Sequence, residues 1–278
     1  MKQMQHNFLF FLLFSFILAA CSEEEDERTE ESLKCLTITE TTGSGTEQVT
    51  TEQKFIYTDG KLTRHVTKQT YTDLWLKGEY THSVSTQISY EPSKVIVTDE
   101  TGTVFTYQIN EKGYATMCTR NEPGGSIRTY IFSYSTGGSE YLTGIKESID
   151  GSPYSEISIE FPDNSTMNIT EKANTIQSKF IASVNGNHPG VSNEKSQLPC
   201  LFLSERYPLS FHVEAFYANI LGEPLATLPG QLTIENSEEV TTYEYTQDQK
   251  GYITSCATKI SVPGRSWNRY VQYSYLLN

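Results

Sequence analysis

Alternation of β-branched or aromatic residues with polar ones is the sequence feature that most constrains the fold. It begins near Leu33 and recurs in short runs, of which 86–90, 94–98 and 156–161 are the clearest. A period of two puts one set of side chains on each face of a strand. Gly, Asn and Asp interrupt the runs at hairpin intervals. We expect an all-β fold, an antiparallel meander of hairpins that forms a barrel or a curved sheet.

Helical periodicity is almost absent from the rest of the chain. The exception is the segment 212–221, which is followed by Gly222. Glycine commonly follows the last turn of a helix. We therefore expect one short helix over 212–221.

One hairpin pattern recurs: alternating aromatic residues, a glycine-containing turn, and a strand that carries threonine. The run Tyr-x4-Lys-Gly-Tyr-x-Thr-x-Cys occupies 107–118 and recurs at 245–256. After a slip of two residues, the matches continue as Pro123 with Pro263, Gly124 with Gly264, Ser126 with Ser266, and Tyr130 with Tyr270. A weaker echo pairs 35–40 with 200–205. Such repetition predicts one β domain, 35–278, made of two related halves at about 35–185 and 200–278.

The N-terminus has the features of an export signal. Lys2 precedes an apolar run, 8–20, that is too short to span a bilayer and suits a signal peptide. Ala19 and Ala20 supply the small residues of a cleavage site, so residues 1–20 are predicted to be removed. With Cys21 behind them, they resemble the lipobox of bacterial lipoproteins. This resemblance implies a diacylglycerol on the Cys21 thiol; the alternative is an ordinary secreted protein with a chance cysteine.

An acidic run directly follows this cysteine and consists of Ser22, Glu23, Glu24, Glu25 and Asp26. A block of like charges stays extended and solvated, so we predict a tether over 21–34. The position of the run also resembles the surface-export signal of Bacteroidetes lipoproteins. That resemblance implies a cell-surface location, on the outer face of the outer membrane. A tether without targeting information is the alternative.

The charge balance argues against nucleic acid as a partner. Removal of Lys2 with the signal leaves 20 basic and 34 acidic side chains. An acidic body repels phosphates, and the sequence has no basic stripe to counter this repulsion. The mean hydropathy is −0.44, and no later apolar run exceeds a few residues. The lipid is therefore the expected link to the membrane.

The tyrosine-rich hairpins behind such a signal resemble Bacteroidetes lipoproteins that carry an uncharacterised domain with a porin-like β-fold. The repeated run at 107–118 is the best local mark, and the resemblance covers most of the mature chain. It implies a fold and no activity, so no functional residues are carried over. A lipid-facing barrel needs an outward apolar band. The second face of these strands is rich in Thr, Ser, Gln and Lys, so we do not expect a membrane pore.

No motif in the sequence predicts catalysis, a metal or a cofactor. His212 and Glu214 offer two ligands, but a zinc site needs three or four. The segment 43–45 lacks the strand–elbow–helix context of a nucleophilic serine. An enzyme is thus not the favoured interpretation. A glycan hydrolase stays open, because its two carboxylates can come from distant segments.

Four cysteines remain in the mature chain, namely Cys35, Cys118, Cys200 and Cys256. An even number in an exported protein permits two disulfides in three pairings. The repeat favours Cys35–Cys118 with Cys200–Cys256, because each bridge would then close one half. Four buried free thiols are the alternative.

Binding is the function class that remains. We expect a surface module for a glycan or an envelope protein; the alternative is a structural or assembly component of the outer membrane. Sugar rings contact exposed aromatic faces flanked by hydrogen-bonding groups. Along the strand predicted at 71–78, Asp73 and Trp75 share a face opposite two leucines, so we predict them as ligand contacts. Trp267, which matches Ile127 in the repeat, is expected to pack in the core.

Overall fold

The computed structural model describes residues 32–44, 47–73, 78–136, 138–173, 175–185 and 188–278. Contacts within the chain define two units, Met1–Ser32 and Leu33–Asn278. The second unit is the body described below. No helix within the described ranges is long and apolar enough to cross a membrane.

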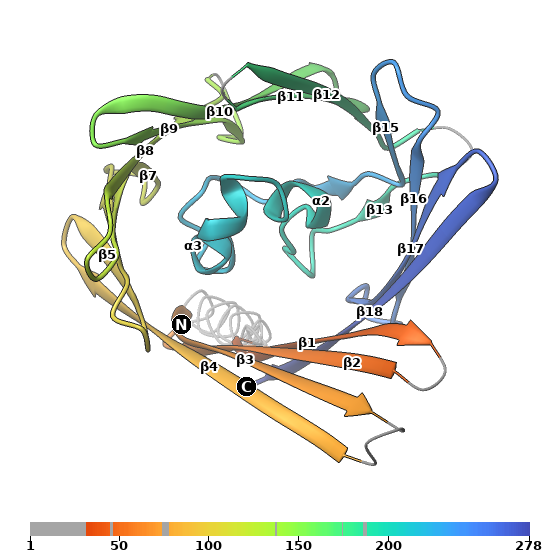
Figure 1. Ribbon diagram of the computed structural model, residues 1–278, viewed down its shortest axis with the longest axis horizontal. Helices are drawn as coiled ribbons and strands as arrows, with labels where there is room; N and C mark the ends of the chain where they lie inside the picture. Colours follow the sequence, from red (N-terminus) through yellow and green to blue (C-terminus); the bar gives the residue numbers. More distant parts are fainter. Residues whose placement is uncertain (1–31, 45–46, 74–77, 137, 174, 186–187) are drawn as a thin grey trace, which may run out of the picture. The chain divides into compact units, whose positions relative to one another are not determined.

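Sixteen antiparallel strands of the body form a closed barrel, which confirms the all-β prediction (Figure 1). Neighbours in sequence are neighbours in space, and the pairing of β1 with β18 closes the ring. The strands in chain order are β1 (Leu33–Ser44), β2 (Glu47–Thr58), β3 (Lys61–Asp73), β4 (Gly78–Glu91), β5 (Lys94–Asp99), β6 (Val104–Ile109), β7 (Ala115–Asn121), β8 (Ile127–Tyr134), β9 (Leu142–Ile149), β10 (Ser152–Asp163), β11 (Thr166–Ala173), β12 (Ile176–Ser183), β15 (Gln231–Ile234), β16 (Val240–Gln247), β17 (Ile253–Val262) and β18 (Arg265–Leu277).

Residues 184–185 and 188–230, which we call the plug, belong to the connection from β12 to β15, and their helical part lies inside the ring of strands (Figure 1). The plug contains β13 (Val191–Ser192), α2 (Leu201–Ser204), the 3-10 helix η1 (Leu209–His212), α3 (Val213–Tyr217) and β14 (Thr227–Leu228).

The helix predicted over 212–221 is present but shorter, because α3 ends at Tyr217. Asn219, with φ of 56°, leaves the helix before Gly222 does. The chain then hydrogen-bonds to the wall, where the Ala115 N–H donates to the Ile220 carbonyl at 2.8 Å. The left-handed conformation of Asn219 therefore ends the helix before Gly222, and the bond to the wall follows directly at Ile220.

Alternation along the strands sends apolar side chains into the lumen, where they pack against the plug. Buried wall residues such as Phe55, Tyr107 and Ile157 form one core cluster with Leu209 and Ala215 of the plug. The outward set is polar, as in Thr37 and Thr39 of β1, Gln87 and Ser89 of β4, and Glu156, Ser158 and Glu160 of β10. The barrel thus has an apolar core inside and a largely polar exterior, in which Ile131 and Ile181 are exposed apolar exceptions.

The repeated sequence forms two equivalent hairpins. Asn110 Oδ1 accepts bonds from the backbone N–H of Lys112 and Tyr114 at 3.0 and 2.9 Å. Asp248 Oδ1 accepts the same two bonds in the second copy, both at 2.9 Å. The glycine in each turn has φ near +90°, a conformation that glycine adopts at little cost.

The equivalence extends to the third strand of each copy, but with a different register from the one the sequence suggested. Cys118 pairs with Tyr130, whereas Cys256 pairs with Val271. The counterpart of Tyr130 is therefore Val271, and the match to Tyr270 is wrong by one residue. A one-residue offset turns a side chain to the other face. Tyr130 is accordingly buried, while Tyr270 is 47% exposed.

The weaker echo between 35–40 and 200–205 has no structural counterpart, because the first segment lies in β1 and the second enters α2. The register shows a different relation. Glu147 of β9 faces Tyr130, and Glu40 of β1 faces Val271. The second copy thus continues from β18 into the N-terminal strand, through the closure of the barrel.

Candidate functional site

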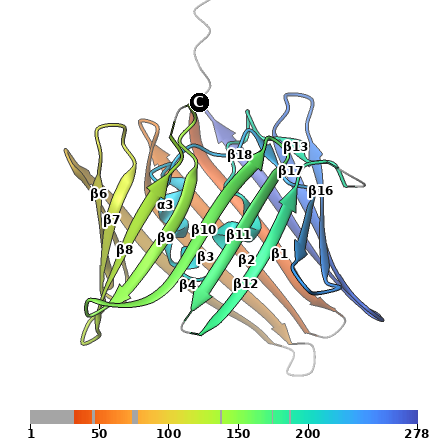
Figure 2. The same cartoon turned by 90° about the horizontal axis from the view of Figure 1, so that it is seen from above.

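The two ends of the barrel differ. Hairpins such as β1–β2, β3–β4, β7–β8 and β9–β10 turn at one end, which we call the mouth. β1 begins and β18 ends at the opposite end, which we call the terminal end (Figure 2). The tilted strands in Figure 2 run between these two ends.

Three consecutive plug residues reach the wall near the mouth in three directions. They form ion pairs or hydrogen bonds between Glu205 and Arg269 at 2.5 Å, Arg206 and Glu171 at 3.7 Å, and Tyr207 and Glu147 at 2.6 Å. The wall partners come from β18, β11 and β9. We call this set of contacts the collar.

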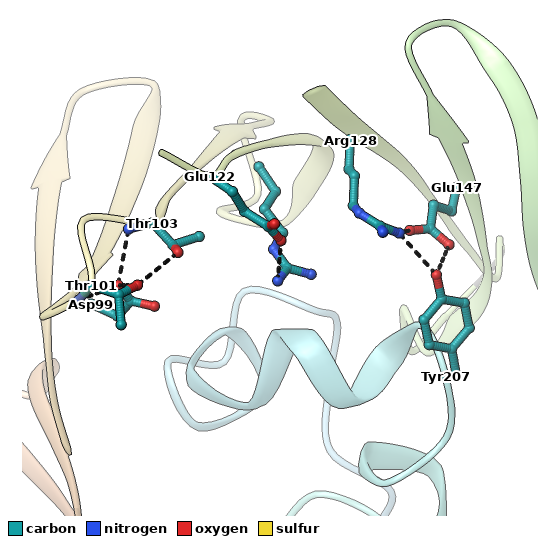
Figure 3. Close-up of polar contacts among 8 residues, drawn as sticks. Asp99, Thr101, Thr103, Glu122, Arg128, Glu147 and Tyr207 are labelled. Atoms are coloured by element: carbon teal, nitrogen blue, oxygen red, sulfur yellow. Dashed lines mark hydrogen bonds and ion pairs between the residues drawn. The ribbon is translucent and has the colours of Figure 1, made fainter. Parts of the chain in front are cut away.

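The best-connected member of the collar is Glu147, whose side chain is fully buried. Its Oε2 accepts a bond from the Tyr207 hydroxyl at 2.6 Å, and its Oε1 accepts one from Arg128 Nη1 at 2.8 Å (Figure 3). Its Oε2 also accepts a bond from Ser155 Oγ at 2.6 Å. Burial, and then the bond to Glu147, raises the pKa of Tyr207. The bond to Glu147 also raises the pKa of Arg128. These bonds satisfy the carboxylate in a place that water does not reach.

The collar is built on the repeat. Arg128 and Arg269 occupy equivalent positions, and so do Glu147 and Glu40, given the register above. Arg269 contacts Glu40 through Nε and Nη2, both at 2.6 Å, and the plug's Glu205 through Nη1. Two repeat-related Arg–Glu pairs therefore hold the plug tip on two sides.

Two further polar groups border the mouth (Figure 3). Arg120 pairs with Glu122, and its guanidinium lies 4.2 Å from the Phe211 ring of the plug. Asp99 Oδ1 accepts bonds from Thr101 and from the Thr103 N–H, which fixes the β5–β6 turn. Burial alone would raise the pKa of Asp99, but these hydrogen bonds outweigh it and lower the pKa.

Exposed aromatic side chains gather at the mouth. They are Tyr71, Tyr80, Tyr154, Tyr207 and Trp267. Tyr71 and Tyr80 pair directly across β3 and β4. Each lies an even number of residues from a buried residue of its own strand, His65 on β3 and Thr86 on β4, and so points to the same face. These two rings therefore lie on the inner side of the wall, above the level of the plug.

Trp267 is 51% exposed, so the prediction that it packs in the core is wrong. The cause is the register of β18. With Val271 as the counterpart of Tyr130, Trp267 corresponds to Ser126 and not to Ile127.

A hollow of about 230 Å³ adjoins the collar at the rim. Tyr154 lines it together with Lys146, Glu156 and Lys172. The Tyr154 ring also lies 6.2 Å from the Tyr207 ring, in an edge-to-face arrangement. An aromatic face beside amine and carboxylate groups can contact both the apolar and the hydroxyl surfaces of a sugar.

A second groove opens at the terminal end. Its outer part has a volume of about 320 Å³ and joins a smaller apolar hollow of about 40 Å³. Both are lined by Tyr141, Phe161, Met167 and Leu225, and the two aromatic rings lie 5.4 Å apart. This groove lies between the wall and the plug.

Several predicted site residues lie outside the described residues, namely Cys21, Ser22, Glu23, Glu24, Glu25, Asp26 and Trp75. Asp73 ends β3 at the mouth, opposite Gly78, although its side chain is not described. β3 therefore ends, and β4 begins, at the aromatic end of the barrel. The ligand contact itself stays a prediction.

All four cysteines of the body are free thiols in the structure. Cys35 lies on β1 and Cys118 on β7, with five strands between them. A disulfide needs Cα atoms within about 7 Å, so a Cys35–Cys118 bridge is incompatible with this fold. Cys200 lies at the start of α2 and Cys256 on β17, and burial raises the pKa of both thiols. A bridge between these two stays a prediction.

His212 and Glu214 point to different partners. His212 is enclosed in the core, where its Nδ1 lies 2.8 Å from the Tyr107 hydroxyl, and burial lowers its pKa to about 3. Glu214 instead lies 2.8 Å from Nδ1 of His65, and this contact across 149 positions had no signal in the sequence. The residues that the structure describes contain no group of three or more His, Cys, Asp or Glu side chains that could hold a metal.

Comparisons with known proteins agree with this architecture. A family described as a domain of unknown function (DUF4595) with porin-like fold matches residues 37–255. A crystal structure of a porin-like protein from Bacteroides uniformis is 35% identical, with a TM-score of 0.81, and the match covers 88% of this chain and 96% of that one. A porin-like protein from Bacteroides vulgatus, 12% identical with a TM-score of 0.50 over 89% and 99% of the chains, shares the fold. No curated protein matches the sequence.

Proposed function

The chain belongs to the family of the porin-like domain of unknown function, DUF4595, and we propose that it is a lipid-anchored envelope protein whose mouth binds a glycan. The observation that carries this proposal is the gathering of exposed aromatic side chains around the mouth, beside the collar. An aromatic rim beside hydrogen-bonding groups suits a binding surface.

The distribution of polarity supports binding over conduction. A membrane-spanning barrel presents an apolar band to lipid and a polar interior to water. Here the interior holds an apolar core, and the outward residues are mostly Thr, Ser, Gln and Glu, with scattered apolar side chains such as Ile131 and Ile181. The porin-like shape thus serves as a rigid scaffold in this proposal.

Chain connectivity supports an outward-facing mouth. Lipid on Cys21 would hold the protein through the tether, which joins the body at Leu33 of β1, at the terminal end. Twelve extended residues span at most about 40 Å. The mouth is the opposite end of the barrel, and its rim is free to meet material outside the cell.

The chemistry of the mouth favours an uncharged glycan. Tyr71 and Tyr80 present a paired aromatic surface beside Gln69, whose Oε1 accepts a bond from the Tyr71 hydroxyl at 2.8 Å. Stacking on such rings and hydrogen bonding to amides match the two surfaces of a sugar ring. The net charge of the body disfavours strongly anionic polymers.

A glycan array followed by titration tests this proposal. We expect Tyr71→Ala with Tyr80→Ala, and separately Trp75→Ala, to weaken binding about tenfold or more. Leu276→Ala, an exposed position at the terminal end, is the control and should bind as the parent does. Binding that is unchanged in both mouth variants would remove the mouth from the site.

An envelope protein is the second candidate partner, in an assembly role. The observation that favours it is the exposure of Ile127 and Ile176 at the same rim, since exposed aliphatic side chains suit protein contacts. Cross-linking on intact cells from a photoreactive residue at position 176 separates the two. A single protein adduct, together with an empty glycan array, would favour assembly.

A further inference from the structure

The outward face of β16–β18 carries a hollow of about 360 Å³ that is separate from the mouth and from the groove at the terminal end. We propose that this hollow is a second binding site, for one ring of an uncharged glycan. This site goes beyond the proposed function, because either site can exist without the other.

The register defines the hollow as two rows of outward side chains. Tyr270, Ala257 and Glu244 are direct cross-strand partners and form one row. Asn268, Lys259 and Thr242 form the adjacent row, two residues along each strand. Directly opposed side chains in a sheet have Cβ atoms about 5 Å apart. The six side chains therefore surround one small area.

The hollow arises because a small side chain occupies its centre and an aromatic ring borders it. Ala257 contributes a single methyl group between the larger Tyr270 and Glu244. The Tyr270 side chain is 47% exposed, so part of it is free for contact. A sugar ring can rest over the methyl group and against the phenol ring.

The polar groups around the hollow suit a ligand that has no net charge. Lys259 donates hydrogen bonds and Glu244 accepts them, and their opposite charges sum to zero. Within the described residues, neither side chain takes part in an ion pair. Asn268 adds both a donor and an acceptor. Sugar hydroxyls donate and accept together, which matches this mixed set.

The other copy of the repeat shows that the barrel does not require this patch. The counterparts of Tyr270, Ala257 and Glu244 are Thr129, Thr119 and Thr106, which form the equivalent row on β8, β7 and β6. Several inward positions keep their identity in both copies, as in Tyr107 with Tyr245, Cys118 with Cys256, and Tyr134 with Tyr275, although the inward Tyr130 is replaced by Val271. In the outward row, an aromatic ring, a methyl group and a carboxylate thus take the places of three threonines, and this set can contact a ligand.

Affinity electrophoresis of the full mature chain tests the site. The gels contain one neutral polysaccharide each, a glucan, a mannan, a xylan or a galactan, and a polyuronate serves as the charged comparison. We expect at least one neutral polymer to retard the parent. Tyr270→Ala should weaken that retardation about tenfold, and Ala257→Leu should do the same by filling the hollow. Tyr270→Phe keeps the ring and should retain most of the binding.

Thr129→Ala, at the counterpart position, is the matched control and should behave as the parent. Equal melting temperatures show that the variants fold alike, and Ala257→Leu tests the site even if loss of the Tyr270 side chain destabilises β18. The proposal is overturned if no neutral polymer retards the parent, if the polyuronate is preferred, or if both hollow variants bind normally. Loss of binding in Tyr71→Ala with Tyr80→Ala alone would assign binding to the mouth and reject the outward site.

Discussion

Replacement of Glu147 by Gln should destabilise the protein by about 3 kcal/mol. The side chain is fully buried and accepts hydrogen bonds from Arg128, Tyr207 and Ser155. A glutamine fills the same space, but it removes the charge that pairs with Arg128 and places an amide N–H₂ where a donor already points.

The magnitude follows from the burial of each partner. A hydrogen bond to a charged group contributes about 1.5–3 kcal/mol, and breaking a buried ion pair costs about 3–5 kcal/mol. The Arg128 side chain is 26% exposed, so water recovers part of the lost interaction. We therefore expect a value at the lower end of the ion-pair range.

Urea unfolding followed by circular dichroism measures the effect, and the repeat provides a matched control. Glu40→Gln removes the equivalent carboxylate, which is 21% exposed, and should cost less than Glu147→Gln. Glu156→Gln breaks the surface pair with Lys146 and should change stability by less than about 1 kcal/mol. A cost below about 1 kcal/mol for Glu147→Gln, or an equal cost for Glu40→Gln, would refute the assignment of Glu147 as the main anchor of the plug tip.

Four further predictions concern individual residues and one short run. Burial lowers the pKa of His212 to about 3. As the pH falls from about 6.5 towards 3, the unfolded chain therefore binds a proton at this residue while the folded chain does not, and the free energy of unfolding decreases. His212→Gln should reduce the loss of unfolding free energy measured between pH 7 and pH 4 by about 3 kcal/mol, and an unchanged pH dependence would contradict this. Cys35, the one partly exposed thiol of the described body, should react with iodoacetamide first, and simultaneous labelling of all four thiols would show that the other three are not protected. Cys21→Ser should abolish acyl labelling and release the protein from membranes, whereas persistent labelling would place the lipid elsewhere. Alanine in place of residues 23–26 should keep the lipid but hide the protein from protease added to intact cells; unchanged cleavage would leave the run as a simple tether.

The sequence alone determined those features that neighbouring residues specify. Alternation predicted the strands and their polar outer face, since a period of two needs only local order. Gly, Asn and Asp marked the interruptions between strands, and the chain turns at one of them through Asp59 and Gly60, whose positive φ of 50° and 73° these residue types tolerate. The repeated hairpins were recognisable for the same reason.

Only the tertiary structure decided which distant segments meet. The closure of β1 on β18, the plug inside the ring, and the collar from Glu205 to Tyr207 join residues far apart in the chain. No local pattern encodes such partners, because many polar pairs of similar chemistry compete and burial selects among them. The register of β18 shows most clearly what the sequence could not determine. An offset of one residue is invisible in a loose repeat, yet it sent Tyr270 and not Val271 to the surface, because side chains of a strand alternate between its two faces.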